Sequence, residues 1–392
     1  MNIPHLPITF RRPPLEAPTG GRSLAETLPA DQVHPQVKTL VARFQTRLAD
    51  LQELPLAKGR VALVVAARNE EKYIASNLDG LIARTPKNGE LAVVLNGCTD
   101  NTEGAVRTWA ANNPKVQLMK PGALKAGTKV AEGKIPVTLI VKESGGKLGA
   151  LVEMESEFRR RGQMPEFVMQ VDADTQLRQE TLPRLLEAMK AHPYAAVSAR
   201  THYVLPHGET RPLVLGNEVT NLLHGTPGTE MLTGQGTLSR TPFFSAGHAA
   251  LRETLPQVAS EDALYSALLR FTGNDTLVHR DALLDTEGVS DPKVMAERAG
   301  RHVKGTVQLN EMFGPHLTQL GMKYYQLKPT VTLAQGVKFF NQYVTHAESG
   351  QRMAHLRRII GSVQDGVVYS KAVKAAESEP DSKEAYDWVP QR

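Results

Sequence analysis

Short continuous apolar runs, separated by mixed polar segments, dominate the first half of the chain. They lie at residues 61–66, 91–95, 137–141 and 167–171. A continuous rather than alternating apolar run is typical of a strand that is buried on both faces of a parallel sheet. Between the runs, apolar residues recur at helical spacing. This spacing predicts helices over 69–82, 99–111 (with Thr99 or Asp100 as N-cap) and 148–160. Alternating strands and helices predict an α/β fold with a mostly parallel sheet and right-handed crossovers.

The segments before this α/β region have a different pattern. Residues 1 to about 30 are rich in Pro, Gly and polar residues, so we expect an extended or partly disordered arm. Apolar residues at helical spacing then predict a helix over 35–54. The arm and this helix form the first predicted part of the chain, 1–58.

After about residue 200 the alternation weakens. The segment 225–245 is rich in Gly, Thr and Pro and is typical of a loop. A helix over 263–271 and a short strand over 276–278 follow, and helical patterns dominate from Met295 onward. We therefore predict a central domain over 59–305, with halves 59–175 and 176–305, and a C-terminal helical extension over 306–392.

Composition fits a soluble globular protein. The chain has 392 residues, of which 41% are hydrophobic and 22% charged, enough for two or three domains of about 150 residues or for one elaborated α/β domain. No apolar run approaches the roughly 20 residues that a membrane helix needs, and the N-terminus lacks a signal-peptide pattern. Cys98 is the only cysteine, which excludes an intramolecular disulfide and favours a reducing cytoplasm. The net charge of +5 permits phosphate-bearing substrates, anionic lipid surfaces or nucleic acid and requires none of them.

Polar segments follow three of the predicted strands, at 66–70, 96–100 and 172–174. In open parallel sheets, ligands bind beyond the carboxyl ends of the strands, so we expect a site formed by these segments. No G-x-G-x-x-G and no G-x-x-x-x-G-K-[ST] is present, which argues against a dinucleotide-binding domain and against a P-loop.

The segment Asp172-Ala173-Asp174 is the most informative of the three. Two carboxylates one residue apart repel each other. A divalent cation with oxygen ligands would relieve the repulsion, and a nucleotide diphosphate is an obvious polyanionic ligand for that cation. The alternative is an acidic turn that caps a helix beginning near Gln179. The local sequence leaves both interpretations open.

Several motifs, in this order and spacing, resemble those of the family 2 glycosyltransferases of the GT-A fold, over about residues 60–305. The segment 64–71 resembles the first strand and nucleotide loop, and 93–102 resembles V-D-D-G-S-T-D-x-T. The motifs that follow are G-K-x-x-A-L at 146–151, D-x-D at 172–174, E-D at 261–262 and a later strand at 279–287. The resemblance implies a GT-A (Rossmann-like), mostly parallel sheet flanked by helices.

The resemblance also implies a hexosyltransferase that inverts configuration and uses a nucleotide diphosphate sugar with Mn²⁺ or Mg²⁺. It assigns the metal to Asp172 and Asp174, with His302 as a candidate third ligand. Asp262 becomes the candidate general base for the acceptor hydroxyl, and Glu261 orients the acceptor or a neighbouring side chain. The nucleotide-sugar site would be lined by Ala67, Arg68, Glu70, Asn96, Lys147 and Asp172.

Two departures from the family pattern change these expectations. Asn96 stands where the base-contacting Asp usually lies, which leaves the choice between UDP- and GDP-sugars open. The Trp of the processive motif Q-x-x-R-W is replaced by His302. Together with the lack of membrane helices, this replacement predicts a non-processive cytoplasmic enzyme. Its acceptor carries a hydroxyl, the basic charge favours an anionic one, and peripheral membrane or nucleic-acid contact is permitted.

Other interpretations stay open for the chain as a whole. A sugar nucleotidyltransferase would carry a glycine-rich basic loop after the first strand, and 66–70 has no glycine. A glycosyltransferase acting on modified nucleic acid would bind duplex DNA in a salt-dependent way. A non-catalytic binding module is disfavoured because both acidic pairs are present.

Individual residues also have structural alternatives. Asp262 or Ser260 would cap the helix that follows, and His302 would lie on the surface of a basic helix. Arg68 would form an ion pair with Glu70. Residues 234–236 would form either an acceptor-side loop or a turn that only needs its glycines for geometry.

Overall fold

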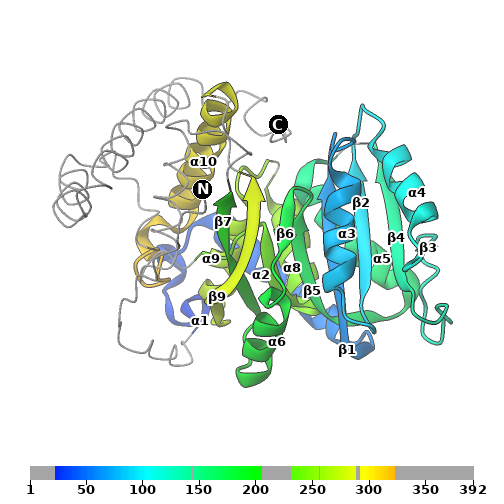
Figure 1. Cartoon of the computed structure of the whole chain (residues 1–392). Coiled ribbons are helices and arrows are strands. Elements are labelled where there is room, and N and C mark those ends of the chain that lie inside the picture. The colour runs from blue at the N-terminus through cyan, green and yellow to red at the C-terminus, as the bar shows by residue number, and fades with distance from the viewer. Residues whose placement is uncertain (1–22, 144, 205–230, 256, 288–291, 323–392) are drawn as a thin grey trace, which may run out of the picture.

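The structure is a computed structural model in which an extended sheet is covered by helices on both faces (Figure 1). It describes residues 23–143, 145–204, 231–255, 257–287 and 292–322. Within these ranges only the backbone is described at 203–204, 287, 292–300 and 302–303.

Nine strands form one sheet in the order β3-β4-β2-β1-β5-β8-β7-β9-β6. Strands β1 to β5 are Leu56–Ala67, Glu90–Asn96, Val116–Met119, Ile135–Lys142 and Met164–Asp172. Strands β6 to β9 are Thr175–Leu177, Ala196–Val204, Gly236–Arg240 and Thr276–Glu287. Strands β1 to β5 pair in parallel. Strand β8 pairs antiparallel with both β5 and β7, and β7 runs parallel to β9. The sheet is therefore mostly parallel, as predicted.

Helices cover the two faces of the sheet. The described helices in the first half of the chain are α1 (Leu24–Thr27), η1 (Ala30–Gln32), α2 (Pro35–Gln52), α3 (Ile74–Arg84), α4 (Thr102–Asn112), α5 (Gly146–Arg161) and α6 (Thr181–Ala191). Those in the second half are α8 (Thr241–Thr254), α9 (Glu261–Phe271), α10 (Pro292–Phe313) and η2 (Gly314–His316). Helices α2, α5, α8 and α9 contribute to one hydrophobic core, and α3, α4 and α6 contribute to the other. No described helix has the length and apolar character needed to cross a membrane.

The four predicted strands are confirmed as β1, β2, β4 and β5. Their runs are continuous because both faces are covered, so residues such as Leu63 and Val64 are equally buried although they point to opposite faces. The helices predicted from periodicity are also present, although their starts are shifted by several residues at α3 and α4. The predicted N-cap of α4 is wrong, since the helix is capped at Asn101 rather than at Thr99 or Asp100.

The predicted loop over 225–245 is wrong in its second half. Residues 236–240 form β8, and α8 begins at Thr241. The predicted strand at 276–278 is longer and extends to Glu287 as β9. Residues 225–230 lie outside the described residues.

Two of the predicted domain limits can be compared with the helices of the structure. The helix expected before the main domain is α2, while the predicted arm contains the short helix α1 in its described part. The limit at residue 305 lies within α10. The division into three parts therefore stays a prediction, and most of the extension lies outside the described residues.

The register of the sheet determines where the strand ends meet. Ala66 in β1 pairs with Asp172 in β5, and Ala67 pairs with Leu95 in β2. Strand β8 enters beside the end of β5, with Gly236 opposite Val171. The predicted segments that follow β1, β2 and β5 therefore lie along one edge of the sheet, together with the residues that precede β8.

Candidate active site

Lys147 lies at the centre of the predicted site residues. It stands in the first turn of α5, and its Nζ lies 2.6 Å from Asp172 Oδ1 and 2.9 Å from Glu261 Oε1. Its third neighbour is the carbonyl oxygen of Gly234, at 3.5 Å. The side chains of Lys147, Asp172 and Glu261 are between 14% and 18% exposed. A single ammonium group thus joins the end of β5 to the start of α9.

The segment 172–174 is a turn between two strands. Asp172 ends β5, and β6 begins at Thr175. Helix α6 begins only at Thr181 and receives no side-chain cap, so the helix-capping alternative for these carboxylates is wrong. The Nδ2 group of Asn77 in α3 donates a hydrogen bond to the carbonyl oxygen of Ala173, which fixes the turn to the neighbouring helix.

Both carboxylate oxygens of Asp262 accept hydrogen bonds. Oδ1 accepts from Ser260 Oγ at 2.6 Å and from the backbone N–H of Ala263 at 2.9 Å. Oδ2 accepts from the backbone N–H of Gly234 at 3.1 Å. Asp262 thus satisfies a backbone donor of the first turn of α9, as the structural alternative expected, and it also reaches the chain segment that leads into β8.

Burial and the local charges change the acidity of these groups. Burial raises the pKa of Asp172 to about 6 against the opposing effect of Lys147. Burial also raises the pKa of Asp262, and the negative charge of Glu261 adds to this effect. Burial alone would raise the pKa of Glu261, but the Lys147 ammonium outweighs it and the pKa is lowered. Glu261 is therefore the ionised partner of Lys147, while Asp262 is the more basic carboxylate.

The metal predicted from the family fits the carboxylates that are present. Asp174 is 7% exposed, and among the described residues its Oδ1 has no hydrogen-bond partner. A buried carboxylate oxygen without a partner is costly, and a hard divalent cation would satisfy it. No three His, Cys, Asp or Glu side chains in the described part of the chain lie close enough together to hold a metal by themselves.

His302 lies on α10, but its side chain is outside the described residues, so its role as a ligand stays a prediction. The same helix approaches the acidic segment at another point. A Cβ atom added to Gly305 would lie 2.5 Å from Ser260 Cβ. The backbone of α10 therefore packs directly against the residue that precedes Glu261 and Asp262.

The other predicted donor-site residues lie along the ends of β1 and β2. Ala67 and Asn96 are the last residues of these strands, and both are buried. Among the described residues, Asn96 Oδ1 has no hydrogen-bond partner. Arg68 and Glu70 follow in the β1–α3 loop, where the backbone N–H of Glu70 donates to Thr102 Oγ1 at 2.8 Å.

Hydrogen bonds join the two loops that carry these residues. Asn69, which adopts a left-handed backbone with φ of 57°, accepts from the backbone N–H of Thr99 at 2.7 Å. Asp100 accepts from the backbone N–H groups of Glu71 and Thr102, at 3.2 Å and 3.0 Å. The loops after β1 and β2 are thus held as one unit.

Two further residues shape the site and were not recognised as part of it from the sequence. Gln170 is buried in β5, and its Nε2 donates to the carbonyl oxygen of Gly234 at 2.9 Å. Asn77 holds the 172–174 turn, as described above. An amide within the otherwise apolar run 167–171 was the available signal for Gln170, since a buried polar side chain needs a partner.

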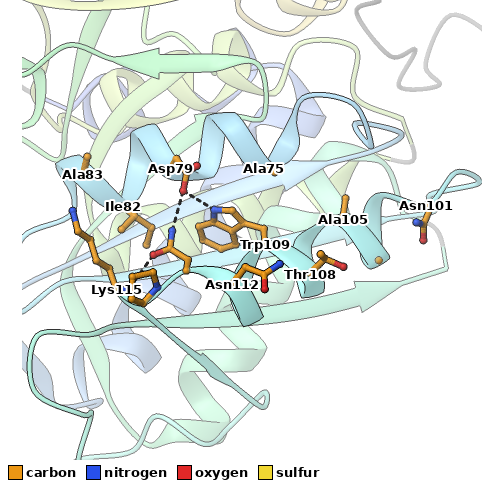
Figure 2. Close-up of a pocket in the computed structure, with 13 residues that line it drawn as sticks. Ala75, Asp79, Ile82, Ala83, Asn101, Ala105, Thr108, Trp109, Asn112 and Lys115 are labelled. Carbon is orange, nitrogen blue, oxygen red and sulfur yellow. Dashed lines mark hydrogen bonds between the residues drawn. The ribbon is translucent and has the colours of Figure 1, made fainter.

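A large open cavity lies elsewhere, between α3 and α4, and has a volume of about 750 Å³ (Figure 2). Its one carboxylate, Asp79, accepts hydrogen bonds from Trp109 Nε1 at 2.8 Å and from Asn113 Nδ2 at 2.9 Å. None of the predicted site residues lines this cavity. Its acidic group is already paired, so we place the chemistry at the strand ends.

The sequence profile described as Glycosyl transferase family 2 matches residues 62–255. The chain belongs to this glycosyltransferase family. The match begins within β1, extends through β8 and α8, and includes the 172–174 turn. No curated protein matches the enzyme's sequence significantly.

One solved structure supports the GT-A fold of this glycosyltransferase. The mannosyltransferase PcManGT from Pyrobaculum calidifontis, solved in complex with GDP-Man and Mn²⁺, is 17% identical, with a TM-score of 0.54 over 92% of this chain and 99% of that chain. S. aureus TarS 1–349 in complex with UDP-GlcNAc is 16% identical, with a TM-score of 0.37 over 81% and 92%. Glucosyl-3-phosphoglycerate synthase from Mycobacterium tuberculosis, in complex with Mn²⁺, UDP and glucosyl-3-phosphoglycerate, is 16% identical, with a TM-score of 0.38 over 69% and 84%. The last two similarities are too low to support an argument.

Proposed function

We propose that this enzyme transfers a hexose from a nucleotide diphosphate sugar to an acceptor hydroxyl, with inversion at the anomeric carbon and with Mn²⁺ or Mg²⁺ as cofactor. One observation carries the proposal. Lys147 brings a donor-side carboxylate, Asp172, and the acidic pair 261–262 into a single site. In a transferase, the donor and acceptor groups must meet in this way for a direct displacement.

On the donor side, Asp172 and Asp174 would hold the metal, which supplies Lewis-acid stabilisation of the leaving nucleotide diphosphate. Ala67, Arg68, Glu70 and Asn96 would line the nucleotide site, where the ends of β1 and β2 meet. The proposed donor is a UDP- or GDP-sugar, and the amide of Asn96, which can donate to or accept from a base, leaves the choice between them open. GDP-mannose is the donor bound to PcManGT.

On the acceptor side, Asp262 would remove the hydroxyl proton as that oxygen attacks the anomeric carbon. The bond to the nucleotide diphosphate breaks on the opposite face, which inverts configuration. The raised pKa of Asp262 suits this role, because a more basic carboxylate accepts a proton more readily. Glu261 would keep Lys147 in position, and His302 stays a candidate third metal ligand.

The competing functions receive less support. A sugar nucleotidyltransferase would hold phosphates with glycines after β1, and the loop there carries none. No comparison favours a nucleic-acid acceptor, so we do not include one. As part of the proposal, we place the reaction in the cytoplasm, where a chain with Cys98 as its only cysteine has no need of an oxidising compartment.

The decisive experiment is a donor screen that follows release of nucleotide diphosphate from UDP- and GDP-sugars in the presence of Mn²⁺. We expect hydrolysis or transfer from at least one donor, loss of turnover with EDTA and recovery when Mn²⁺ is added back. If no donor is consumed with or without metal, the proposed function is wrong. Turnover that persists in EDTA would instead remove only the metal from the proposal.

A further inference from the structure

A positively charged side chain, Lys147, lies between two acidic side chains of the site. Asp172 and Glu261 both lie within 3 Å of Lys147 Nζ, at 2.6 Å and 2.9 Å. The site thus has a cation beside a residue that the metal also needs.

We propose that Lys147 is an internal counter-cation that offsets part of the negative charge of Asp172 and Glu261 and so keeps a divalent ion from binding before the nucleotide diphosphate. This inference rests on the proposed function. It adds an order of binding, in which metal and nucleotide bind together and neither binds well alone.

Electrostatic repulsion gives the first reason. A metal ion coordinated by Asp172 would lie close to the Lys147 ammonium, because both cations contact the same carboxylate. Like charges repel strongly in a site that is largely shielded from water. The oxygen atoms of a diphosphate reverse this effect, since they offer Lys147 new partners while they also ligate the metal.

The surroundings of Lys147 give the second reason. Its ammonium lies over Gly234, where an added Cβ atom would be 2.9 Å from Nζ and 3.2 Å from Glu261 Oε1. A side chain at this position would crowd both the ammonium and the Glu261 carboxylate. The lysine stem carries four rotatable methylene groups, so Nζ can exchange one oxygen partner for another while α5 stays in place.

The test measures Mn²⁺ binding directly, by the loss of the free-ion signal in electron paramagnetic resonance. The wild-type enzyme is titrated with Mn²⁺ alone and in the presence of saturating UDP or GDP. We expect nucleotide to strengthen Mn²⁺ binding by at least about tenfold, an ordinary size for coupling between two ligands. Reciprocity requires Mn²⁺ to strengthen nucleotide binding by the same factor.

The variant Lys147→Met removes the charge and keeps an unbranched side chain of similar length. We expect it to bind Mn²⁺ alone about tenfold more tightly than the wild type and to lose most of the gain from nucleotide. Lys147→Arg keeps the charge and should retain weak binding of Mn²⁺ alone. The matched control is Lys142→Met, which breaks a 2.7 Å ion pair with Glu153 between β4 and α5 and should bind Mn²⁺ like the wild type.

Several outcomes would overturn the inference. Equal Mn²⁺ affinity in folded Lys147→Met and wild-type enzyme would do so, as would wild-type Mn²⁺ binding that is unaffected by either nucleotide. This second measurement decides the question even if Lys147→Met does not fold. Absence of Mn²⁺ binding under every condition would also overturn it, whereas the donor screen would still report separately on the proposed transfer.

Discussion

Asp262 accepts hydrogen bonds at both of its carboxylate oxygens. The variant Asp262→Asn keeps the size of the side chain and removes its charge, with the loss of acceptance at one of the two positions because an amide NH₂ group only donates. We expect transfer to fall by about 10²–10⁴-fold, the usual contribution of a positioned general base. Donor binding, measured by calorimetry, should stay nearly unchanged, because the proposed function places Asp262 on the acceptor side.

The matched control is Ser260→Ala, which removes the 2.6 Å hydrogen bond to the same carboxylate and leaves the charge in place. Its transfer rate should change far less than that of Asp262→Asn. Equal loss of transfer and donor binding in Asp262→Asn would show that the residue acts only by capping α9.

At the residue scale, the sequence predicted the acidic groups better than their connections. Asp172, Asp174 and the pair 261–262 are recognisable because carboxylates that end a buried strand or begin a helix follow a known motif. The bridge by Lys147 is not recognisable in this way. It depends on contacts between α5, β5 and α9, and no periodicity encodes distances between residues so far apart in the chain.

At the scale of elements, Asp285 in β9 connects this strand to β7 and to the end of β6, at one side of the sheet. It lies in β9, accepts from Arg178 Nε at 2.9 Å just beyond β6, and lies 2.9 Å from His202 Nδ1 in β7. Burial opposes ionisation of Asp285, but the hydrogen bonds from His202 and Arg178 outweigh it and lower the pKa to about 2. The folded state thus favours the ionised carboxylate more than the unfolded chain does.

We therefore expect Asp285→Asn to reduce the free energy of unfolding by about 1 kcal/mol at pH 7. The expected loss is small because Arg178 is exposed and water screens its interaction with Asp285. Because the folded pKa is lowered, the wild type has this stability above the unfolded pKa of about 4 and loses it as pH falls toward 2. The free energy of unfolding of both proteins is measured by urea unfolding at pH 7 and at pH 3. The difference between the variant and the wild type should be smaller at pH 3.

Asp281→Asn is the control in the same strand. Asp281 is 73% exposed and lies 3.8 Å from Arg184, so its replacement should leave stability unchanged at both pH values. A constant deficit of Asp285→Asn across this range would show that packing, rather than charge, explains its effect.

At the element scale, the sequence predicted the strands that read as continuous apolar runs and missed β8, in which polar residues predominate. Strand β8 reads Gly-Thr-Leu-Ser-Arg and resembles a loop. Its Thr237 is nevertheless buried, because the hydroxyl donates to the carbonyl oxygen of Thr233 at 2.7 Å and also lies 3.1 Å from Ser198 Oγ. These partners come from β7 and the preceding loop, which only the assembled sheet brings together.

For the whole molecule, α2 belongs to the same core as the catalytic elements. Phe44 is 1% exposed and packs against Phe243 of α8, with ring centroids 6.3 Å apart. We expect Phe44→Ala to reduce the free energy of unfolding by about 3–5 kcal/mol. Circular dichroism and the fluorescence of Trp109, on the opposite face of the sheet, should report the same shifted transition.

The substitution Trp388→Phe, made in the wild type and in Phe44→Ala, leaves Trp109 as the source of the tryptophan fluorescence. The control for position is Gln45→Ala, at an exposed position of α2, which should leave the unfolding transition unchanged. A Trp109 transition that stays unchanged in Phe44→Ala, while circular dichroism shows an early step, would mean that the N-terminal helix unfolds as a separate unit. That result would favour the predicted domain limit at residue 58.

The order of strands in the sheet has a consequence for behaviour at high concentration. The described sheet ends in its two shortest strands, β3 with four residues and β6 with three. Exposed Lys115 and Lys120 flank β3. An edge strand invites strands of other molecules through its unpaired N–H and C=O groups, and short length and nearby lysines oppose such pairing. The long central strands therefore lie between edge strands that expose few unpaired N–H and C=O groups, so the sheet offers little surface for pairing with strands of other molecules.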